Sequence, residues 1–571
     1  MATKPSDLTY GVDDVPPLPR LLALALQYAI LIGVYMVVVV LVARAAGASA
    51  DLTTDLVSLA FIAAGIGAAV QAWNGRVFGS GFLAPPVYSA IYFAPAILAA
   101  KAGGLPAVAG MTVFAALVEI GLSRFLDRLR VVFQPLIAGF AVLVVGIQLG
   151  LVGVSEALDA AGETGPDFLS DVAVGLVTLA ACIGFSIWGR GVVRLVSTLL
   201  GLALGVVVAL ATGVIGASTF ATVAGADWID LPDPSFIAYA FEPGLAPAFV
   251  ASAIAATLRT VGVVTTAQRI NDADWKRPDM DNVARGVVGD GLGCLAGGLL
   301  SAPGMSSAAS FVGLSSATAA TSRSIAYATA ALLILFAFIP KVGATIVGLP
   351  MGIAGAILVF TAAFLIVSGI QVMLTHGLDP RGGFAVSIAL FVGIFSQVNP
   401  GYFKRLPDWM HMVTSDMLTV SLVIAIALTL VFRIGIRRRD AAAWDATDAA
   451  HAELGAFIER EGKAWKIDRS VVARAEDAVA ALVDRLKQGG YLASPLALRA
   501  DFDTLELTVH IVYRGVAPPP MHHHLAFLHP TEHPEAATVI GLAGASLATG
   551  ADRTSVSIDN DEVTIRLGFA A

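Results

Sequence analysis

Two interruptions rich in glycine, proline and serine, each within a long apolar stretch, constrain this chain more than any other feature. They occupy residues 79–95 and 301–313. A backbone that faces lipid must satisfy its own hydrogen bonds, so irregular backbone at membrane depth is stable only where it lines a cavity. Paired broken helices in corresponding positions of two halves are typical of the binding sites of secondary transporters. The two interruptions therefore predict a transporter.

The composition agrees with a chain that lies mostly in a bilayer. Hydrophobic residues make up 57% of the 571 residues, charged residues only 14%, and the mean hydropathy is +0.80. Soluble proteins carry roughly 25% charged residues. The net charge of −8 does not suggest a nucleic-acid partner. We expect no enzymatic activity and no cofactor, because the membrane part contains no nucleophile–base pair and no metal-binding set.

Neither the two cysteines nor the first apolar segment indicates a disulfide, a metal site or a cleaved signal peptide. Cys182 and Cys294 both lie in apolar stretches, so they are expected to be small buried side chains without a disulfide or a metal. Residues 21–42 lack an Ala-x-Ala-like cleavage site after a short apolar core. This segment is therefore predicted to remain as a helix.

The apolar stretches predict an all-α polytopic membrane protein with fourteen transmembrane segments. A span needs about 20 apolar residues. The third and tenth segments are short and interrupted, which fits a 7+7 inverted repeat. The segments are 21–43, 54–73, 87–100, 106–123, 134–154, 171–188, 195–215, 245–268, 282–300, 310–321, 324–347, 349–371, 382–398 and 415–435.

Loop charges predict the orientation, because Lys and Arg are retained on the cytoplasmic side. Basic residues follow helices 4, 6, 8 and 14, whereas the loops at 156–167 and 227–242 are acidic; Lys404 and Arg405 depart from the pattern. Residues 1–20 are then a cytoplasmic segment and residues 21–436 the transmembrane domain. Both termini are predicted to be cytoplasmic, in a bacterial-type inner membrane.

After Arg439 the composition becomes that of a soluble domain. Residues 437–447 are predicted to be a linker and residues 448–571 a cytoplasmic α+β domain. Helical periodicity marks 448–460 and 468–487, alternation marks strands at 496–502, 505–513, 554–558 and 563–569, and a further helix is expected at 540–549. A domain of this size can hold its own core.

Several motifs together resemble the nucleobase–ascorbate transporter family. The opening at 8–19 with Gln27 resembles the entry to that family's first helix, and 285–293 resembles its ninth helix. The Phe-Gln-Pro-Leu-Ile-Ala-Gly of 133–139 is similar to the family's Phe-Pro-Pro-x-x-x-Gly. The segments 348–352 and 368–369 match its twelfth helix, so the resemblance spans roughly residues 8–435.

The resemblance implies a secondary active transporter of a nucleobase-like substrate, a purine such as xanthine or urate, or uracil. It implies coupling to a cation, and an elevator-type movement of a core domain (helices 1–4 and 8–11) against a gate domain (helices 5–7 and 12–14). It also implies a homodimer.

The chain departs from the family at the side chains expected to bind the base. Gln27 is followed by Tyr28 where the family has His, and Arg259 stands where it has a carboxylate or amide. Ser310 and Phe311 stand where it has Glu or Gln and then Asn. The base would need other donors and acceptors. The candidate substrate-binding residues are Gln27, Tyr28, Ala90, Arg259, Thr260, Ser306, Ser307, Ser310 and Phe311.

Arg259 is the most informative single residue. Arginine near mid-bilayer costs at least ~2.5–3.5 kcal/mol and almost always faces a cavity or a partner. With the positive ends of two broken helices it would form an anion site. The substrate could then be a urate- or xanthine-like anion, or the chain could be an anion carrier or exchanger outside the nucleobase class. The alternative is a structural pair with Asp290 or Glu119.

Asp290 and Glu119 are the candidates for carrying a coupling proton. Asp290 lies between glycines in helix 9 and Glu119 near the end of helix 4. Both could instead be packing partners or charges close to a loop. Tyr28 could contact the substrate or be a core aromatic. No histidine falls inside a predicted span, which excludes a His-based proton relay.

The C-terminal domain resembles a degenerate GHKL-type ATPase of the anti-sigma-factor kinase kind. Ala480 stands at the position expected for the magnesium-binding Asn, and Tyr513-Arg514 replaces the Asp before Gly515, so no ATP hydrolysis is expected. His522, His523 and His524 form a weak metal-site candidate in a loop that could equally be unliganded. A signalling domain also leaves open a transporter-like ligand sensor.

Overall fold

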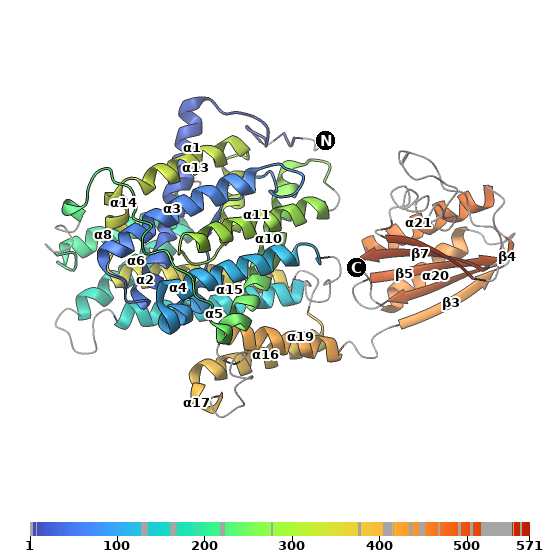
Figure 1. The fold of residues 1–571 in the computed structure, drawn as a ribbon. Coiled ribbons are helices and arrows are strands. Elements are labelled where there is room, and N and C mark those ends of the chain that lie inside the picture. The colour runs from blue at the N-terminus through green and yellow to red at the C-terminus, as the bar shows by residue number, and fades with distance from the viewer. Residues whose placement is uncertain are drawn as a thin grey trace. The chain divides into compact units, whose positions relative to one another are not determined.

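We describe the fold from a computed structural model, in which the chain divides into two compact units, Met1–Leu428 and Thr429–Ala571. Figure 1 shows both units, and each is described by itself. The structure describes all residues except 1–3, 7, 127–134, 160–167, 191, 217–222, 276–277, 375–377, 404–413, 415, 433–437, 445–450, 466, 468, 489–492, 503–505, 515–550, 552, 560–561 and 571.

The first unit is helical, and its helices pack as two bundles. The core bundle consists of α1 (Leu18–Val34), α2 (Met36–Ala45), α3 (Ala50–Ala72), α4 (Ala90–Leu122), α10 (Ala246–Asn271), α11 (Met280–Leu299), α12 (Ala309–Ala317), α13 (Arg323–Ala337) and α14 (Pro340–Val347). The gate bundle consists of α5 (Pro135–Asp159), α6 (Phe168–Trp188), α7 (Val192–Leu195), α8 (Ser197–Ala211), α15 (Met351–Met373), α16 (Pro380–Val398), α17 (Pro400–Phe403) and α19 (Met417–Phe432). A 3-10 turn, η1 (Pro243–Leu245), leads into α10.

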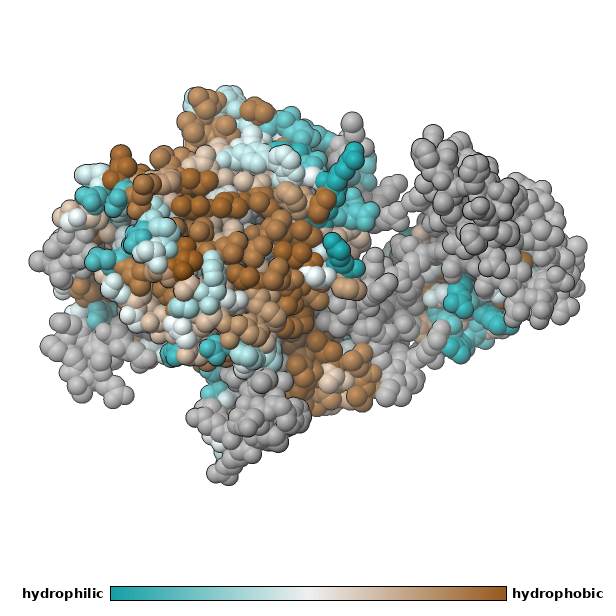
Figure 2. All heavy atoms as spheres, viewed as in Figure 1, coloured by the Kyte–Doolittle hydropathy of each residue, from teal (hydrophilic) through white to brown (hydrophobic). Residues whose placement is uncertain are grey.

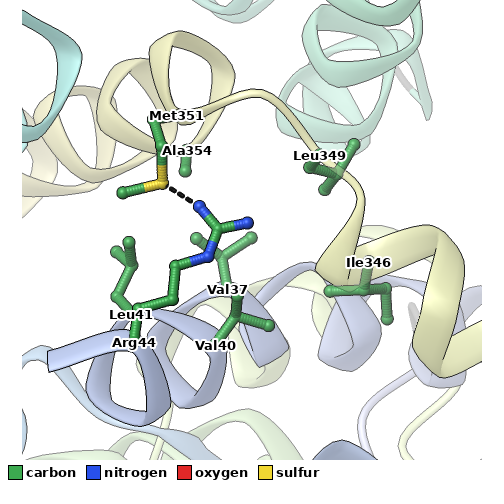
Figure 3. Close-up of a pocket in the computed structure, with 8 residues that line it drawn as sticks. All are labelled: Val37, Val40, Leu41, Arg44, Ile346, Leu349, Met351 and Ala354. Atoms are coloured by element: carbon green, nitrogen blue, oxygen red, sulfur yellow. Dashed lines mark hydrogen bonds between the residues drawn. The ribbon is translucent and has the colours of Figure 1, made fainter. Parts of the chain in front are cut away.

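Helix packing supports this division. In the core bundle α4 packs on α10 and α11, and α3 packs on α11 and α13. In the gate bundle α5 lies along α15, and α6 packs on α8 and α15. Arg44 at the end of α2 connects the two bundles, as Figure 3 shows. Its Nη2 donates to the carbonyl of Val347 at 2.7 Å, and its Nη1 contacts the sulfur of Met351 at the start of α15.

The polytopic membrane architecture is confirmed. Among the described residues, eight helices are long and apolar enough to cross a bilayer, or nine if the 82° bent pair α13–α14 counts as one span. Large apolar side chains also face outward: Phe391 is 74% exposed and Leu176 is 61% exposed. Figure 2 shows hydrophobic side chains across much of the visible face of this unit. The count of fourteen segments and the inverted repeat remain predictions.

The two predicted interruptions form a pair of short strands, a departure from an all-α membrane part. β1 (Pro86–Tyr88) and β2 (Met305–Ser307) pair antiparallel, with Val87 opposite Ser306. All six strand residues are buried. Each extended segment satisfies the other's backbone groups, which is how irregular backbone is kept within a membrane bundle. The sequence pattern predicts each break separately but not that the two breaks pair.

The third and fourth predicted segments correspond to α4, in which two helical stretches meet at a kink. Within α4, Gly103 and Gly104 leave helical geometry, and Gly104 has a φ of +67°. Glycine adopts this left-handed conformation without the steric cost of a Cβ atom. Cys182 and Cys294 are both free and buried, as predicted.

The second unit contains one antiparallel sheet and two helices. The strand order is β3-β4-β5-β7-β6, and α20 (His451–Trp465) and α21 (Arg469–Gln488) precede the middle strands in sequence. The strands are β3 (Arg438–Trp444), β4 (Ala493–Phe502), β5 (Glu506–Arg514), β6 (Arg553–Asp559) and β7 (Glu562–Ala570). Alternate residues of β4, β5 and β7 form an apolar core with the two helices.

The predicted linker at 437–447 is wrong for most of its length, because β3 occupies Arg438–Trp444 and pairs with β4. Its Arg-Arg-Asp-Ala-Ala-Ala run lacks the β-branched residues that mark a strand, so the pairing with β4 decides its conformation. The helix predicted at 540–549 and the histidines at 522–524 lie outside the described residues.

Candidate functional site

The strand pair places the N-termini of α4 and α12 on adjacent segments of chain. Ser89 follows β1, and its amide donates to the carbonyl of Gly304 at 3.1 Å. The hydroxyl of Ser89 also accepts a hydrogen bond from the amide of Ile91 at 3.2 Å. Ser89 is therefore the N-cap of α4, the residue type that such a position prefers.

Arg259 of α10 reaches the N-terminus of α4. Its Nη1 donates to the hydroxyl of Ser89 at 3.1 Å. This neutral hydroxyl is the only hydrogen-bond partner of the guanidinium among the described residues. A helix N-terminus carries a partial positive charge, and the guanidinium carries a full one. Two positive groups held in contact within a membrane bundle favour an anion beside them, and the guanidinium presents further donors for it.

Asp290 of α11 is held by neutral donors. The hydroxyl of Thr260 donates to it at 2.6 Å, and Ser307 donates through its amide at 2.6 Å and its hydroxyl at 2.7 Å. Asp290, Thr260 and Ser307 are all fully buried. Asp290 lies within electrostatic range of Arg259 without a direct ion pair. The alternative in which Arg259 simply pairs with Asp290 is therefore not the arrangement found.

Glu119 lies in the last turn of α4, which ends at Leu122 and packs on α11, and it is enclosed by the core bundle. Its side chain is fully buried, and Oε2 accepts from the hydroxyl of Tyr92 at 3.3 Å. The Glu119 and Asp290 carboxyl groups lie within electrostatic range of each other, and Oε1 of Glu119 is buried without a hydrogen-bond partner among the described residues. Two carboxylates close together inside a bundle repel each other, so a proton held by one of them is stabilising.

Aromatic rings from α1, α2 and α12 meet near the same helix ends. Tyr28 stacks on Phe311 with ring centroids 5.4 Å apart, and its hydroxyl donates to the Phe311 carbonyl at 3.0 Å. Both residues are buried. Tyr35, between α1 and α2, approaches the Phe311 ring at 6.4 Å and lies within electrostatic range of Arg259. Tyr28 thus holds Phe311 in place through a ring contact and a hydrogen bond to its backbone.

The remaining candidates divide by exposure. Ala90 is half-buried and Ser310 is exposed, both in the first turn of a helix that follows the strand pair. Ser306 is fully buried and its hydroxyl has no hydrogen-bond partner within the described chain. The amide nitrogen of Gln27 is likewise buried and without such a partner. Ser307 and Thr260 bind Asp290 and do not present their hydroxyls to a ligand.

Sequence reasoning missed two residues of this site, Ser89 and Tyr35. Ser89 could have been found as the serine immediately before a helix at a predicted break. Tyr35 follows Tyr28 by seven residues, two helical turns, which places both on one face. Among the described residues no group of acidic, cysteine or histidine side chains could hold a metal ion.

Comparison with known proteins gives three findings. A family model described as the permease family matches residues 19–401. The chain is 25% identical over 455 residues to the xanthine permease XanQ of Escherichia coli, covering 76% of this chain and 96% of that protein. It is 24% identical over 429 residues to the nucleobase transporter PlUacP of Paenibacillus larvae, covering 74% and 96%.

Solved structures that are similar to this chain include that of SLC26A9. The structure of SLC26A9 aligns with 12% identity and a TM-score of 0.49, covering 76% of this chain and 69% of that one.

Proposed function

Because the chain belongs to the nucleobase–ascorbate transporter family, a family of membrane transporters and not enzymes, we propose that it carries a purine-type base across the membrane as an anion. Xanthine and urate are the substrates that fit best, since both are planar, rich in carbonyl oxygens and readily deprotonated. Uracil is the smaller alternative. The proposal is supported by the names of the relatives XanQ and PlUacP.

The contact between Arg259 and Ser89 carries the proposal. A carboxylate in place of Arg259 would accept hydrogen bonds from a neutral base, whereas a guanidinium can only donate. The positive end of α4 adds to the same field. The ring of Phe311, fixed by Tyr28, offers an apolar face to a planar ligand. A deprotonated purine satisfies both features, because it combines an anionic edge with an aromatic face.

The test is binding of xanthine, urate and uracil to the purified full-length protein, followed by uptake into proteoliposomes. Affinity should rise as the pH passes upward through the pKa of the substrate. Arg259→Ala should weaken binding about 100-fold, the equivalent of about 3 kcal/mol for hydrogen bonds from a charged donor. The control is Arg124→Ala, an exposed arginine after α4. Purine binding that is unchanged by Arg259→Ala would exclude the anion mechanism.

An anion carrier or exchanger is the second candidate, and the same guanidinium supports it. A small carboxylate or inorganic oxyanion would use Arg259 and the α4 N-terminus without needing the Phe311 ring. Phe311→Ala distinguishes the two, since it should weaken purine binding and leave a small oxyanion unaffected. A ligand sensor that signals through the second unit would bind the purine without accumulating it in proteoliposomes.

For cation coupling, we propose that Glu119 and Asp290 hold the transported proton. The support is the proximity of the two carboxyl groups in a fully buried cluster whose hydrogen-bond donors are hydroxyl and amide groups. Glu119→Gln should then abolish concentrative uptake driven by a pH gradient while substrate binding and exchange persist. If Glu119 is only a packing residue, all three activities should fall together.

The proposal extends to the transport cycle and the cellular setting. The core bundle would move as an elevator against the gate bundle, in a homodimer of the bacterial inner membrane with both termini cytoplasmic. The support is the division of the helices into two bundles and the basic loops of the sequence. Cross-linking of single-cysteine pairs across the bundles, with and without substrate, tests the movement.

A further inference from the structure

Tyr35 occupies a tightened turn in the middle of the first span. The amide of Tyr35 donates to the carbonyl of Ile32, and the amide of Val38 donates to the carbonyl of Tyr35, at 3.0 and 3.1 Å. These bonds span three residues, as in a 3-10 turn, and separate α1 from α2. A short 3-10 stretch within a helix often marks a functional position. The turn therefore singles out Tyr35 within an otherwise continuous span.

The hydroxyl of Tyr35 differs from those of the other tyrosines inside the core bundle. Tyr28, Tyr88 and Tyr92 are fully buried, and their hydroxyls donate to Phe311, Ala60 and Glu119 respectively. Tyr35 is only half-buried, and no hydrogen-bond partner is found for its hydroxyl in the described part of the chain. A phenol inside a bundle usually has a partner. The free hydroxyl of Tyr35 is thus available to a ligand.

The neighbours of Tyr35 are the groups already assigned to the site. Its ring lies 6.4 Å from the Phe311 ring with an interplanar angle of 55°. Its hydroxyl end lies within electrostatic range of the Arg259 guanidinium. The α1–α2 turn therefore adds a third segment to the site, beside the N-termini of α4 and α12. A planar ligand held by Arg259 and lying on Phe311 has Tyr35 at its edge.

We propose that Tyr35 is a substrate-binding residue that determines specificity, by donating its hydroxyl proton to an exocyclic oxygen of the purine. This inference rests on the proposed function, since it takes the purine as the ligand. Arg259 would bind one oxygen of the base and Tyr35 a second one. A purine with two exocyclic oxygens would use both groups, whereas a purine with one would use only the guanidinium.

The experiment compares xanthine, which has two exocyclic oxygens, with hypoxanthine, which has one. Binding of each to the purified full-length protein is measured by isothermal titration, for wild type, Tyr35→Phe and Tyr327→Phe. Tyr327 is the matched control, because it lies on α13 with 38% of its surface exposed. Tyr35→Phe should weaken xanthine about tenfold, as one lost hydrogen bond would, and hypoxanthine less than twofold. In uptake assays the loss should appear in KM and not in the maximal rate.

The outcomes separate this inference from the function on which it rests. Wild-type protein that binds neither purine overturns both. Wild-type protein that binds xanthine, with Tyr35→Phe equal to it, overturns only the role of Tyr35. An equal loss for xanthine and hypoxanthine also overturns it, because a hydrogen bond to a second oxygen cannot weaken a ligand that lacks that oxygen. A lower thermal stability of Tyr35→Phe would assign the loss to packing instead.

Discussion

The core bundle and the gate bundle use their buried polar groups in different ways. In the core bundle the carboxyl groups of Asp290 and Glu119 lie within the helices, surrounded by hydroxyl and amide donors. In the gate bundle the buried carboxylate is Asp416, at the start of α19, where it accepts from Gln148 at 2.7 Å and from the amide of Thr419 at 2.9 Å. The first arrangement is costly in a membrane, and the second is an ordinary helix cap.

Burial differs between individual helices of the two bundles. The most apolar windows of α3 and α10 are both 67% buried, whereas those of α6 and α16 are 22% and 33% buried. The other spans do not follow the division, since the window of α4 is 50% buried and those of α5 and α15 are 56% and 50% buried. The contrast between the two bundles therefore lies in their buried carboxyl groups and not in the burial of their helices.

The largest expected effect comes from replacing one buried carboxylate of each bundle, Asp290 or Asp416, by alanine. Asp290→Ala leaves the donors of Thr260 and Ser307 buried without an acceptor, at a cost of roughly 1–3 kcal/mol for each unpaired group. We expect loss of uptake and a clear fall in the melting temperature in detergent. Asp416→Ala removes a cap, which costs about 1 kcal/mol, and leaves the amide of Gln148 without its acceptor, so it should also lower the melting temperature but retain substrate affinity. Equal loss of binding in both variants would contradict the comparison.

Close packing of the gate bundle gives the next effect. A Cβ built on Gly139 of α5 would lie 2.5 Å from the carbonyl oxygen of Gly369 in α15. Gly139→Ala must therefore push the two helices apart, and overpacking typically costs about 1–3 kcal/mol. The matched control is Gly121→Ala, where a Cβ would meet nothing within 4 Å. Thermal unfolding should separate the two; identical melting temperatures would show that the α5–α15 contact is loose.

A smaller effect is expected at the connection between the bundles. Arg44→Ala removes the hydrogen bond to the Val347 carbonyl and the contact with Met351 (Figure 3). Because both of these partners belong to the α14–α15 connection and neither is assigned to the substrate site, Kd should stay unchanged. The maximal uptake rate should change by about two- to fivefold, as expected for one hydrogen bond of ~1 kcal/mol. A change in Kd with an unchanged rate would place Arg44 in the binding site instead.

The smallest effect is expected from the second unit. It has its own apolar core, formed by α20, α21 and three strands of its sheet. Ending the chain before Arg438 should therefore leave the substrate affinity of the first unit unchanged within about twofold, the range of an ordinary surface change. Binding and uptake of the shortened chain give the measurement. A large loss of affinity would favour the sensor alternative, in which the two units communicate.

The sequence predicts most of the helices, because a long apolar stretch in lipid can satisfy its backbone hydrogen bonds by forming a helix. It also singles out Arg259, since a charge in such a stretch needs a cavity or a partner. It could not predict the pairing of β1 with β2, because neither segment alternates or carries a turn signal that links it to the other. The same limit applies to β3, whose strand conformation depends on β4.

Predicting the details of the site requires distances between helices, which periodicity does not provide. Thr260 and Ser307 were candidates for the substrate, but both bind Asp290. The sequence places Glu119 near the end of its helix, and α4 does end at Leu122, but periodicity does not show that the side chain is fully buried beside Tyr92. Ser89 and Tyr35 are identified as site residues only by the geometry of the turns in which they lie.

The register of the strand pair sets an order for the synthesis of this chain. Pro86 pairs with Ser307, which follows it by 221 residues. When α4 enters the bilayer, the partner of the segment before it has not yet been made. The unpaired amides and carbonyls of β1 must therefore be hydrated or bound by the insertion machinery until β2 has been synthesised. A chain that stops before β2 therefore has no completed route to a folded core, and we expect cells to degrade it.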